Sequence, residues 1–287
     1  MPARLLLMHE ELLLPDDVPV HQDVLGEAAR SLRVTADDGV VTVELHKPAR
    51  HNAIDLAMWE AFGRLMPVLA ADDGVDVVVF RGTPGGPFSA GADISEFTTL
   101  RREPADAQRY SEAVEGGEAA IIDFPKPTVA LVQGWALGGG TQVAAACDLR
   151  VCDAGARFAV TPAKLGIVYA LPSTARLVDV VGQAWASFFL LTGEQVDAAT
   201  ALRIGLVHEV ADDVEARAYE LAAVLRSRAR ISLTGGKRLV ARAVQGRREV
   251  DDEVRALYRE AWASAEYAEG VDAFLAKRAP DFRGARA

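Results

Sequence analysis

The fold of this chain is decided by the segment Gln133-Gly134-Trp135-Ala136-Leu137-Gly138-Gly139-Gly140-Thr141-Gln142, which places three consecutive glycines where an apolar strand turns into a helix. Glycine has no Cβ, so another molecule can approach the backbone closely at such a turn. The alanine-rich helix expected over residues 141–147 directs unpaired N–H groups and the positive end of its dipole at the same gap. The turn therefore suits a negative charge that develops on an oxygen atom. Taken alone, the glycines are also explained by a tight connection between a strand and a helix.

A second stretch of small residues comes earlier in the chain, Phe88-Ser89-Ala90-Gly91-Ala92-Asp93-Ile94. Its backbone is able to supply a second N–H group to the same oxygen. Two N–H donors from separate loops form an oxyanion hole, which stabilises negative charge on a carbonyl oxygen during a reaction.

The composition bounds the functions that the chain can have. Half of its 287 residues are apolar and a quarter are charged, as in ordinary globular proteins. Acidic residues outnumber basic ones 41 to 31, which gives a net charge of −10. This balance argues against nucleic acid as the main partner, because binding phosphate backbones needs a basic surface. A local cationic pocket for a phosphorylated ligand remains open.

The cysteines and the first residues bear on location. Cys147 and Cys152 lie in or beside apolar segments without metal-ligand spacing, so we expect buried free thiols and a reducing, cytoplasmic environment. Residues 1–14 contain leucine runs, but His9, Glu10 and Glu11 interrupt them. The segment is too short and too charged to span a bilayer. We expect residues 1–30 to form a loosely attached extension.

Strand and helix patterns alternate through most of the chain. Alternating apolar residues around Asp37-Asp38-Gly39 predict a β-hairpin over residues 31–45. Apolar runs predict further strands, and helical periodicity predicts helices between them. The expected strands lie near residues 75–80, 128–132, 149–151, 157–160 and 206–210, and the expected helices near 59–69, 106–122, 173–181, 184–191 and 197–202.

From residue 214 onward the pattern is almost entirely helical, with expected breaks at Gly235-Gly236 and at Gly246. Strand–helix units followed by a helical tail indicate an α/β core, over residues 31–212, with a helical region over 213–287. Apolar stripes in this tail suggest that it packs on a neighbouring subunit; they comprise Leu221, Val224, Leu225, Val254, Leu257 and Tyr258.

An ordered series of motifs resembles the enoyl-CoA hydratase/isomerase (crotonase) superfamily. Together the motifs cover residues 40–210, with a further match in the tail. They are the segments 48–54, 88–94, 126–130 leading into 134–140, 147–150, 191–194, 201–207 and 274–278.

This resemblance implies a crotonase-like spiral of ββα units with a C-terminal α-helical oligomerisation region, in a homotrimer or a hexamer made of two trimers. It implies acyl-CoA thioester ligands, with coenzyme A as the substrate's carrier and no other cofactor, metal, nucleic acid or membrane partner. The thioester oxygen would receive the N–H groups of Ala92 and Gly139. The coenzyme A path would involve Phe274 and Lys277, commonly from a neighbouring subunit, and the segment residues Ala53, Ala90, Ala92, Asp93 and Ile94. The alternative for Lys277 is a solvated helix charge.

The chain departs from the hydratase pattern at both of its glutamates. The first would lie two residues after the triple glycine, where this chain has Gln142, and the second four residues before Gly166, where it has Pro162. Neither side chain can transfer a proton at neutral pH. The sequence therefore argues against hydration by the two-carboxylate route.

The segment Thr161-Pro162-Ala163-Lys164-Leu165-Gly166-Ile167-Val168-Tyr169 is similar to methylmalonyl-CoA decarboxylases, and residues 130–137 are similar to ethylmalonyl-CoA decarboxylase. By this likeness Tyr169 would orient or polarise a substrate carboxylate, or protonate the enolate. Its alternative role is a structural aromatic ring that caps the acyl pocket. Gln142 is a candidate to hydrogen-bond a carboxylate or water, or else a packing or surface residue. The decarboxylase relative has a histidine where this chain has Ala92.

Three glutamates at helical spacing, Glu112, Glu115 and Glu118, favour a solvated helix face, with a recruited acid as the alternative. The sequence thus predicts a lyase or isomerase of acyl-CoA and fatty acid metabolism that works through a stabilised enolate, by decarboxylation or isomerisation rather than hydration. Two alternatives stay open: an enoyl-CoA hydratase that uses a different acid, and a non-catalytic acyl-CoA-binding protein.

Overall fold

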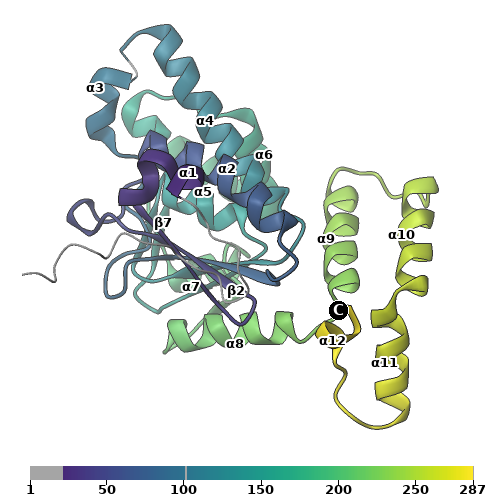
Figure 1. The fold of residues 1–287 in the computed structure, drawn as a ribbon. Helices are drawn as coiled ribbons and strands as arrows, with labels where there is room; N and C mark the ends of the chain where they lie inside the picture. The colour runs from purple at the N-terminus through teal and green to yellow at the C-terminus, as the bar shows by residue number, and fades with distance from the viewer. Residues whose placement is uncertain (1–21, 101, 287) are drawn as a thin grey trace, which may run out of the picture.

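The computed structural model describes residues 22–100 and 102–286. A six-stranded sheet runs through the described core (Figure 1). Its strands follow the order β1-β2-β3-β4-β6-β9. The β1–β2 pair is antiparallel, and the remaining pairs in this sheet are parallel. Its strands are β1 (Leu32–Asp37), β2 (Val40–Leu45), β3 (Val77–Gly82), β4 (Thr128–Val132), β6 (Leu149–Cys152) and β9 (Glu209–Val210).

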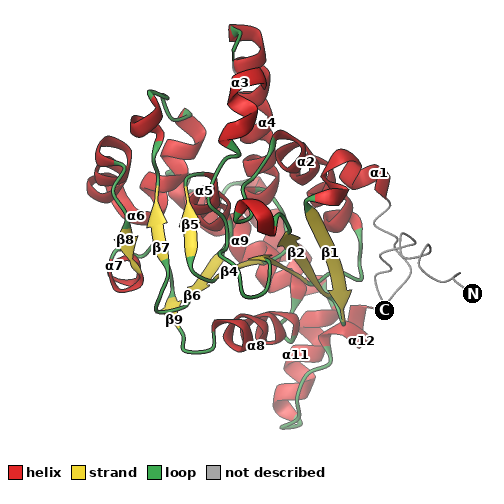
Figure 2. Cartoon of the chain, turned by 90° about the vertical axis from the view of Figure 1, so that its left-hand side faces the viewer, coloured by secondary structure: helices red, strands yellow, loops and turns green. Residues whose placement is uncertain are grey.

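A second, three-stranded sheet lies beside the first (Figure 2). In it β5 (Trp135–Leu137) pairs in parallel with β7 (Arg157–Ala159), and β7 pairs antiparallel with β8 (Val196–Asp197). The predicted hairpin is confirmed: Asp38 and Gly39 both have positive φ, at 46° and 81°, as a type I′ turn requires.

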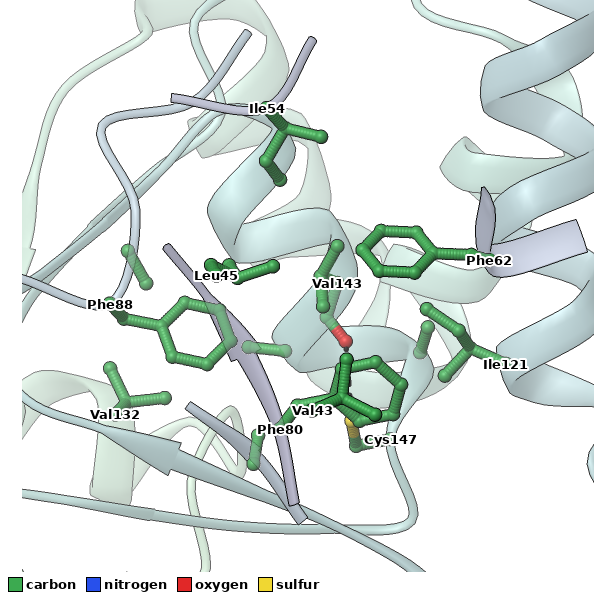
Figure 3. Packing of buried hydrophobic residues seen from close by; sticks show 14 of the residues in the cluster. Val43, Leu45, Ile54, Phe62, Phe80, Phe88, Ile121, Val132, Val143 and Cys147 are labelled. Carbon is green, nitrogen blue, oxygen red and sulfur yellow. Dashed lines mark hydrogen bonds between the residues drawn. The ribbon is translucent and has the colours of Figure 1, made fainter. Parts of the chain in front are cut away.

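Helices cover both faces of the large sheet. Alternate strand residues pack on one side against α2 (Leu56–Ala71), α4 (Pro104–Ile122), α5 (Gly139–Ala146) and α6 (Leu171–Thr192). Figure 3 shows this side, where Phe80 and Val132 of the sheet face Phe62, Ile121 and Val143 of these helices. The other face packs against α8 (Val214–Arg226). Coverage on both faces explains why β3 and β4 are uninterrupted apolar runs.

The C-terminal helices α9 (Arg230–Val244), α10 (Asp252–Ala263) and α11 (Ala265–Leu275) stand apart from the sheet (Figure 1). Arg230 and Lys237 of α9 tie this region to the core through ion pairs with Asp76 and Asp148, at 2.7 Å each. The remaining helical segments are α1 (Gln22–Leu25), α3 (Phe97–Leu100), α7 (Ala198–Arg203), α12 (Phe282–Arg286) and the 3-10 turns Gly26–Arg30, Pro48–Arg50, Ile94–Glu96 and Pro162–Leu165.

Three expectations from sequence need correction. No helix break occurs at Gly235-Gly236, because α9 runs through both residues. The strand expected over residues 206–210 is reduced to Glu209–Val210. Of the expected loose extension, residues 22–30 pack on α2: Leu25 and Ala28 are buried, and Arg64 donates to the Val24 carbonyl oxygen at 2.9 Å. Residues 1–21 lie outside the described part.

Two further expectations concern the cysteines and the membrane. Cys147 and Cys152 are free and buried, as the sequence predicts. Within residues 22–100 and 102–286, no helix combines the length and apolar character needed to cross a bilayer.

Candidate active site

A cavity of about 390 Å³ lies where helices α2, α4, α5 and α6 meet the loops after β3 and β7. Its volume is in the range of small-molecule sites. Trp59 of α2, Val114 of α4 and Ile167 contribute apolar wall, while Gln142 and Ser173 contribute polar groups. The cavity therefore offers an apolar chamber with a few polar groups in defined places.

Glycines bring two loops into direct backbone contact beside this cavity. Gly138 has φ 50° and ψ −115°, a conformation that a side chain would strain. A Cβ on Gly91 (φ 99°) would lie 2.8 Å from the Leu137 carbonyl oxygen, and one on Gly140 would lie 2.9 Å from the Ser89 carbonyl oxygen. Only glycine fits at positions 91 and 140. The segments 88–94 and 133–142 therefore pack with their backbones in direct contact.

The N–H groups of Ala92 and Gly139 become neighbours at this contact. Ile54 bridges to Ala92 through bonds from Ile54 N to Gly91 O and from Asp93 N to Ile54 O, so the N–H of Ala92 itself faces the other way. Gly139 is the first residue of α5, and its N–H has no partner within the helix. A Cβ built on Gly139 would lie 3.6 Å from Ala92 N.

Both residues line the cavity. Among residues 22–100 and 102–286, no backbone acceptor faces either N–H. The structure thus brings together the two donors that the sequence predicts, and their arrangement is able to hold one oxygen atom between them.

Gln142 lies one helical turn beyond Gly139, on the same side of α5. Its side chain is buried, and Nε2 donates to Glu118 Oε2 at 2.7 Å and to Ser173 Oγ at 2.9 Å. Ser173 Oγ in turn donates to Glu118 Oε2. Helices α4, α5 and α6 therefore share one polar cluster, made of Glu118, Gln142 and Ser173.

The structure corrects the expectation of a solvated glutamate face. Glu112 is exposed and accepts a bond from Gln108, and Glu115 is half-buried, but only 3% of Glu118 is exposed. Glu118 lies on the side of α4 that packs against α5 and α6, next to the buried Gly117. The helix spacing is as predicted, and the packing selects one of the three carboxyl groups for the interior.

Burial dominates the electrostatics of this cluster. Burial raises the pKa of the Glu118 carboxyl group, although its hydrogen bonds from Ser173 and Gln142 and the charge of Arg176 act against the rise. The pKa of Tyr169 is also raised, first by burial and then by the nearby Glu118 charge, while a hydrogen bond with Ser173 opposes this. Tyr169 therefore carries its hydroxyl proton at neutral pH and is able to donate a hydrogen bond.

Both positions where hydratases carry a glutamate lie in the cavity wall. Gln142 occupies the first, and Pro162, at the start of a 3-10 turn, occupies the second. Tyr169 also lines the cavity and packs against the main core. No carboxyl group is therefore available from either position.

Only some of the residues predicted to contact coenzyme A line the cavity. Ala90 and Ile94 line the cavity beside Ala92, whereas Ala53 is buried and does not. The Asp93 carboxylate accepts bonds from Lys47 Nζ at 2.8 Å and Ser95 Oγ at 2.6 Å. Burial alone would raise its pKa, but these hydrogen bonds lower it to about 2. The Asp93 carboxylate is thus occupied by hydrogen bonds within the protein.

Phe274 and Lys277 lie at the other end of the chain. Phe274 is 84% exposed on α11 and lines a separate hollow among the C-terminal helices. Lys277 follows α11 with a positive φ of 53°. Neither residue lines the cavity in the single chain.

The sequence gives no sign that Trp59 or Ser173 belongs to the site, and it offers Glu118 only as one of three glutamates from which an acid could be recruited. Trp59 has the spacing of a core residue, and its ring does pack against Phe62, but it also forms cavity wall. Ser173 resembles an ordinary residue of a helix first turn, and Glu118 a surface glutamate. No local pattern could have identified them, because their roles come from the meeting of three helices.

Comparison with known proteins points to one family. The model of the enoyl-CoA hydratase/isomerase family matches residues 35–285 of this chain. A putative enoyl-CoA hydratase from Thermus thermophilus is 37% identical over 248 residues, covering 85% of this chain and 97% of that protein. The 2,3-dehydroadipyl-CoA hydratase of Escherichia coli is 31% identical over 256 residues, covering 88% and 98%.

A solved structure agrees with these sequence matches. The putative enoyl-CoA hydratase/isomerase family protein from Hyphomonas neptunium superimposes with a TM-score of 0.84 and 32% identity, over 88% of this chain and 97% of that one. None of these three relatives is named a decarboxylase, so the local likeness at residues 161–169 stays an expectation. By its sequence matches and its fold, the chain belongs to the enoyl-CoA hydratase/isomerase family, within the crotonase superfamily.

Proposed function

We propose that this protein binds an acyl-CoA thioester and converts it through an enolate held by the N–H groups of Ala92 and Gly139, by decarboxylation or isomerisation rather than hydration. One observation carries the proposal. Two neighbouring N–H groups without a backbone acceptor in the described chain border a cavity that has Gln142 and Pro162 where a hydratase needs carboxyl groups.

The two N–H groups would act on the thioester oxygen. Negative charge builds on this oxygen when the enolate forms, and the N-terminal end of α5 adds its positive dipole there. Each preorganised donor contributes roughly 3–4 kcal/mol to such a transition state. Decarboxylation and isomerisation both form an enolate with negative charge on this oxygen, so the two donors would stabilise the intermediate of either reaction.

Hydration needs more than the donors. Adding water across a double bond requires one group to activate the water and another to deliver a proton. The amide of Gln142 does not titrate, and Pro162 has no acidic group. A malonyl-type thioester, by contrast, loses CO₂ without a general base at the first step.

Tyr169 would hold the substrate carboxylate before CO₂ leaves. Its neutral hydroxyl is a hydrogen-bond donor, and the apolar wall from Trp59 and Ile167 keeps water from competing. This role is the same as the one implied by the decarboxylase-like segment.

We propose further that the chain works as a homotrimer or a pair of trimers, with Phe274 and Lys277 reaching the nucleotide portion of coenzyme A in a neighbouring subunit. Large apolar side chains remain exposed on the C-terminal helices: Trp262, Phe274 and Leu275. Light scattering on the purified protein tests this assembly, and a monomer at micromolar concentration would contradict it.

The names of the relatives favour a second candidate, hydration by an acid other than the two missing glutamates. Glu118, which accepts hydrogen bonds from the cavity-wall residues Gln142 and Ser173, is a carboxyl group that would serve for it. A non-catalytic acyl-CoA binder is the third candidate, since such a protein keeps the coenzyme A groove and the oxyanion donors and needs no proton-transfer groups.

Product analysis separates the three. The purified protein is incubated with methylmalonyl-CoA, with a 3-enoyl-CoA and with crotonyl-CoA, and the products are identified by mass spectrometry. We expect loss of CO₂ from the first or double-bond migration in the second. Addition of water to crotonyl-CoA as the only reaction would overturn the proposal in favour of hydration, and retained but unchanged ligands would indicate a binder.

A further inference from the structure

A buried carboxyl group lies directly behind the cavity wall, connected to it by a single hydroxyl group. Glu118 does not itself line the cavity, but Ser173 does, and Ser173 Oγ donates to Glu118 Oε2. The side chain of Gln142, also in the cavity wall, donates to the same carboxylate oxygen at 2.7 Å.

The burial of Glu118 is not explained by an ion pair. In the described part of the chain no lysine, arginine or histidine forms a salt bridge with it, and its two hydrogen-bond partners are neutral. The guanidinium of Arg176 instead donates to the carbonyl oxygens of Ala145 and Cys147, at 2.7 and 3.2 Å. A buried carboxylate without a cationic partner is costly, so proteins rarely place one there for stability alone.

The hydrogen bonds fix which group can move a proton. Gln142 Nε2 uses its two hydrogens on Glu118 and Ser173, so the amide holds both side chains in place without itself titrating. The Ser173 hydroxyl accepts from Gln142 and donates to Glu118. When Glu118 carries a proton the Ser173–Glu118 bond reverses, and the Ser173 hydrogen is released to turn toward the cavity. Ser173 is also the member of the pair that reaches the cavity.

We propose that Glu118 and Ser173 form a proton relay that exchanges one proton with the carbon next to the thioester, in place of the carboxyl groups missing at positions 142 and 162. The inference rests on the proposed acyl-CoA chemistry and names the acid for it. Ser173 is the catalytic residue of this pair, and Glu118 acts through it.

With a malonyl-type thioester, loss of CO₂ precedes the protonation. The bond to the carboxylate breaks, CO₂ leaves, and the electron pair stays on the enolate held by Ala92 and Gly139. The Ser173 hydroxyl then gives its proton to the α-carbon, forming the new C–H bond, while the Glu118 carboxylic acid gives its own proton to Ser173. Glu118 remains as a carboxylate and regains a proton from water. In an isomerisation the relay starts from ionised Glu118: Ser173 takes the α-proton and passes its own proton to the Glu118 carboxylate. The protonated pair then returns one proton at the γ-carbon.

The surroundings favour the acid form that this step needs. Burial raises the pKa of Glu118, and Glu115 on the same helix adds to the rise, while Arg176 of α6 and the hydrogen bonds from Ser173 and Gln142 oppose it. Tyr169 also faces the cluster, and its raised pKa keeps it neutral. Since the protonated form persists to higher pH than in water, decarboxylation should fall as pH rises through the pKa of Glu118.

The test uses Glu118→Gln, which keeps the shape and removes the acid, and Glu112→Gln as a matched control at an exposed position of the same helix. The full-length protein is assayed with methylmalonyl-CoA and a 3-enoyl-CoA in H₂O and D₂O between pH 5 and 9. We expect Glu118→Gln to lower kcat by roughly 100-fold or more with KM little changed, to abolish the alkaline fall of decarboxylation, and to slow deuterium entry at the α-carbon. Glu112→Gln should behave as the unmodified protein.

A second pair keeps the test decisive if Glu118→Gln folds poorly in a thermal melt. Ser173→Ala should lower kcat to a similar extent, and Ser173→Thr, which restores a hydroxyl, should recover part of it. An active protein whose kcat and pH profile are unchanged by Glu118→Gln or Ser173→Ala would overturn the relay and leave the proposed function intact. If the unmodified protein converts neither thioester and exchanges no α-hydrogen of butyryl-CoA with D₂O, the proposed function and the relay both fail.

Discussion

Gly117 of α4 packs directly on the backbone of Trp59 of α2. A Cβ added at Gly117 would lie 2.6 Å from the Trp59 carbonyl oxygen and 3.0 Å from the Trp59 ring atom Cε3. The two helices therefore touch at a point where only glycine fits, and the same contact sets the position of a ring that lines the cavity.

Gly117→Ala should destabilise the protein by about 1–3 kcal/mol, because the methyl group forces the helices apart in a well-packed core. The neighbouring Gly116 has no atom within 4 Å of an added Cβ. Gly116→Ala should therefore stabilise the protein, by up to ~1 kcal/mol, through helix propensity alone. Urea unfolding of both variants measures the difference, and equal stabilities would contradict the close contact.

Much of this architecture could be predicted from local patterns. The hairpin follows from Asp38-Gly39, the buried strands from runs such as Val77–Phe80, and a close backbone approach at the strand-to-helix turn from the glycines at 138–140. In each case a short segment carries its own physical constraint. The pairing of Ala92 with Gly139 additionally required the family resemblance, since separate loops do not reveal their contact.

The parts that could not be predicted depend on which face of a helix is covered. Glu118 has the same local spacing as Glu112 and Glu115, and only the packing of α4 against α5 and α6 buries it. The expected helix break at Gly235 was wrong for a similar reason. Gly235 looks like a helix break in sequence, but it lies within α9, where it is buried against Leu257 of α10.

Gly139→Pro tests the oxyanion donor on α5. Proline removes the N–H group, and the first position of a helix tolerates its missing donor. Its Cβ would lie 3.3 Å from the Trp59 ring atom Cζ2, so the ring must shift slightly to keep the fold. We expect turnover of any thioester substrate to fall by roughly 100-fold or more, as for the loss of one such donor. Kinetics together with a thermal melt provide the measurement. Normal turnover in a folded Gly139→Pro protein would exclude this N–H from the reaction.

Tyr169→Phe removes one hydroxyl from the cavity wall and leaves the ring. If that hydroxyl holds a substrate carboxylate, its loss should cost about 1.5–3 kcal/mol, or roughly 10- to 100-fold in turnover. The affinity for coenzyme A, measured by calorimetry, should stay nearly the same. Tyr258→Phe on α10, outside the cavity lining, is the control. Unchanged kinetics would assign Tyr169 to packing alone.

Lys47 joins the loop that carries Ala92 to the start of α2. Its Nζ donates to Asp93 and to Asp55, at 2.8 Å each, and Asp55 caps α2 through the N–H of Met58. The pKa of Asp93 is about 2 against its usual 3.8. A folded-state pKa below the unfolded value adds stability above pH 4, and this contribution is lost as the pH falls from about 4 to 2.

Asp93→Asn should therefore lower the free energy of unfolding by about 2 kcal/mol near pH 6, which corresponds to the lowering of the Asp93 pKa from 3.8 to about 2. Below pH 4 the loss should become progressively smaller, because Asp93 in the unmodified protein then becomes protonated too. Urea unfolding at pH 6, 4 and 3 measures the gap between the variant and the unmodified protein. Asp37→Asn, at an exposed position on β1, is the control and should show no such convergence. A gap that stays constant from pH 6 to 3 would mean that the Asp93 charge does not hold this loop.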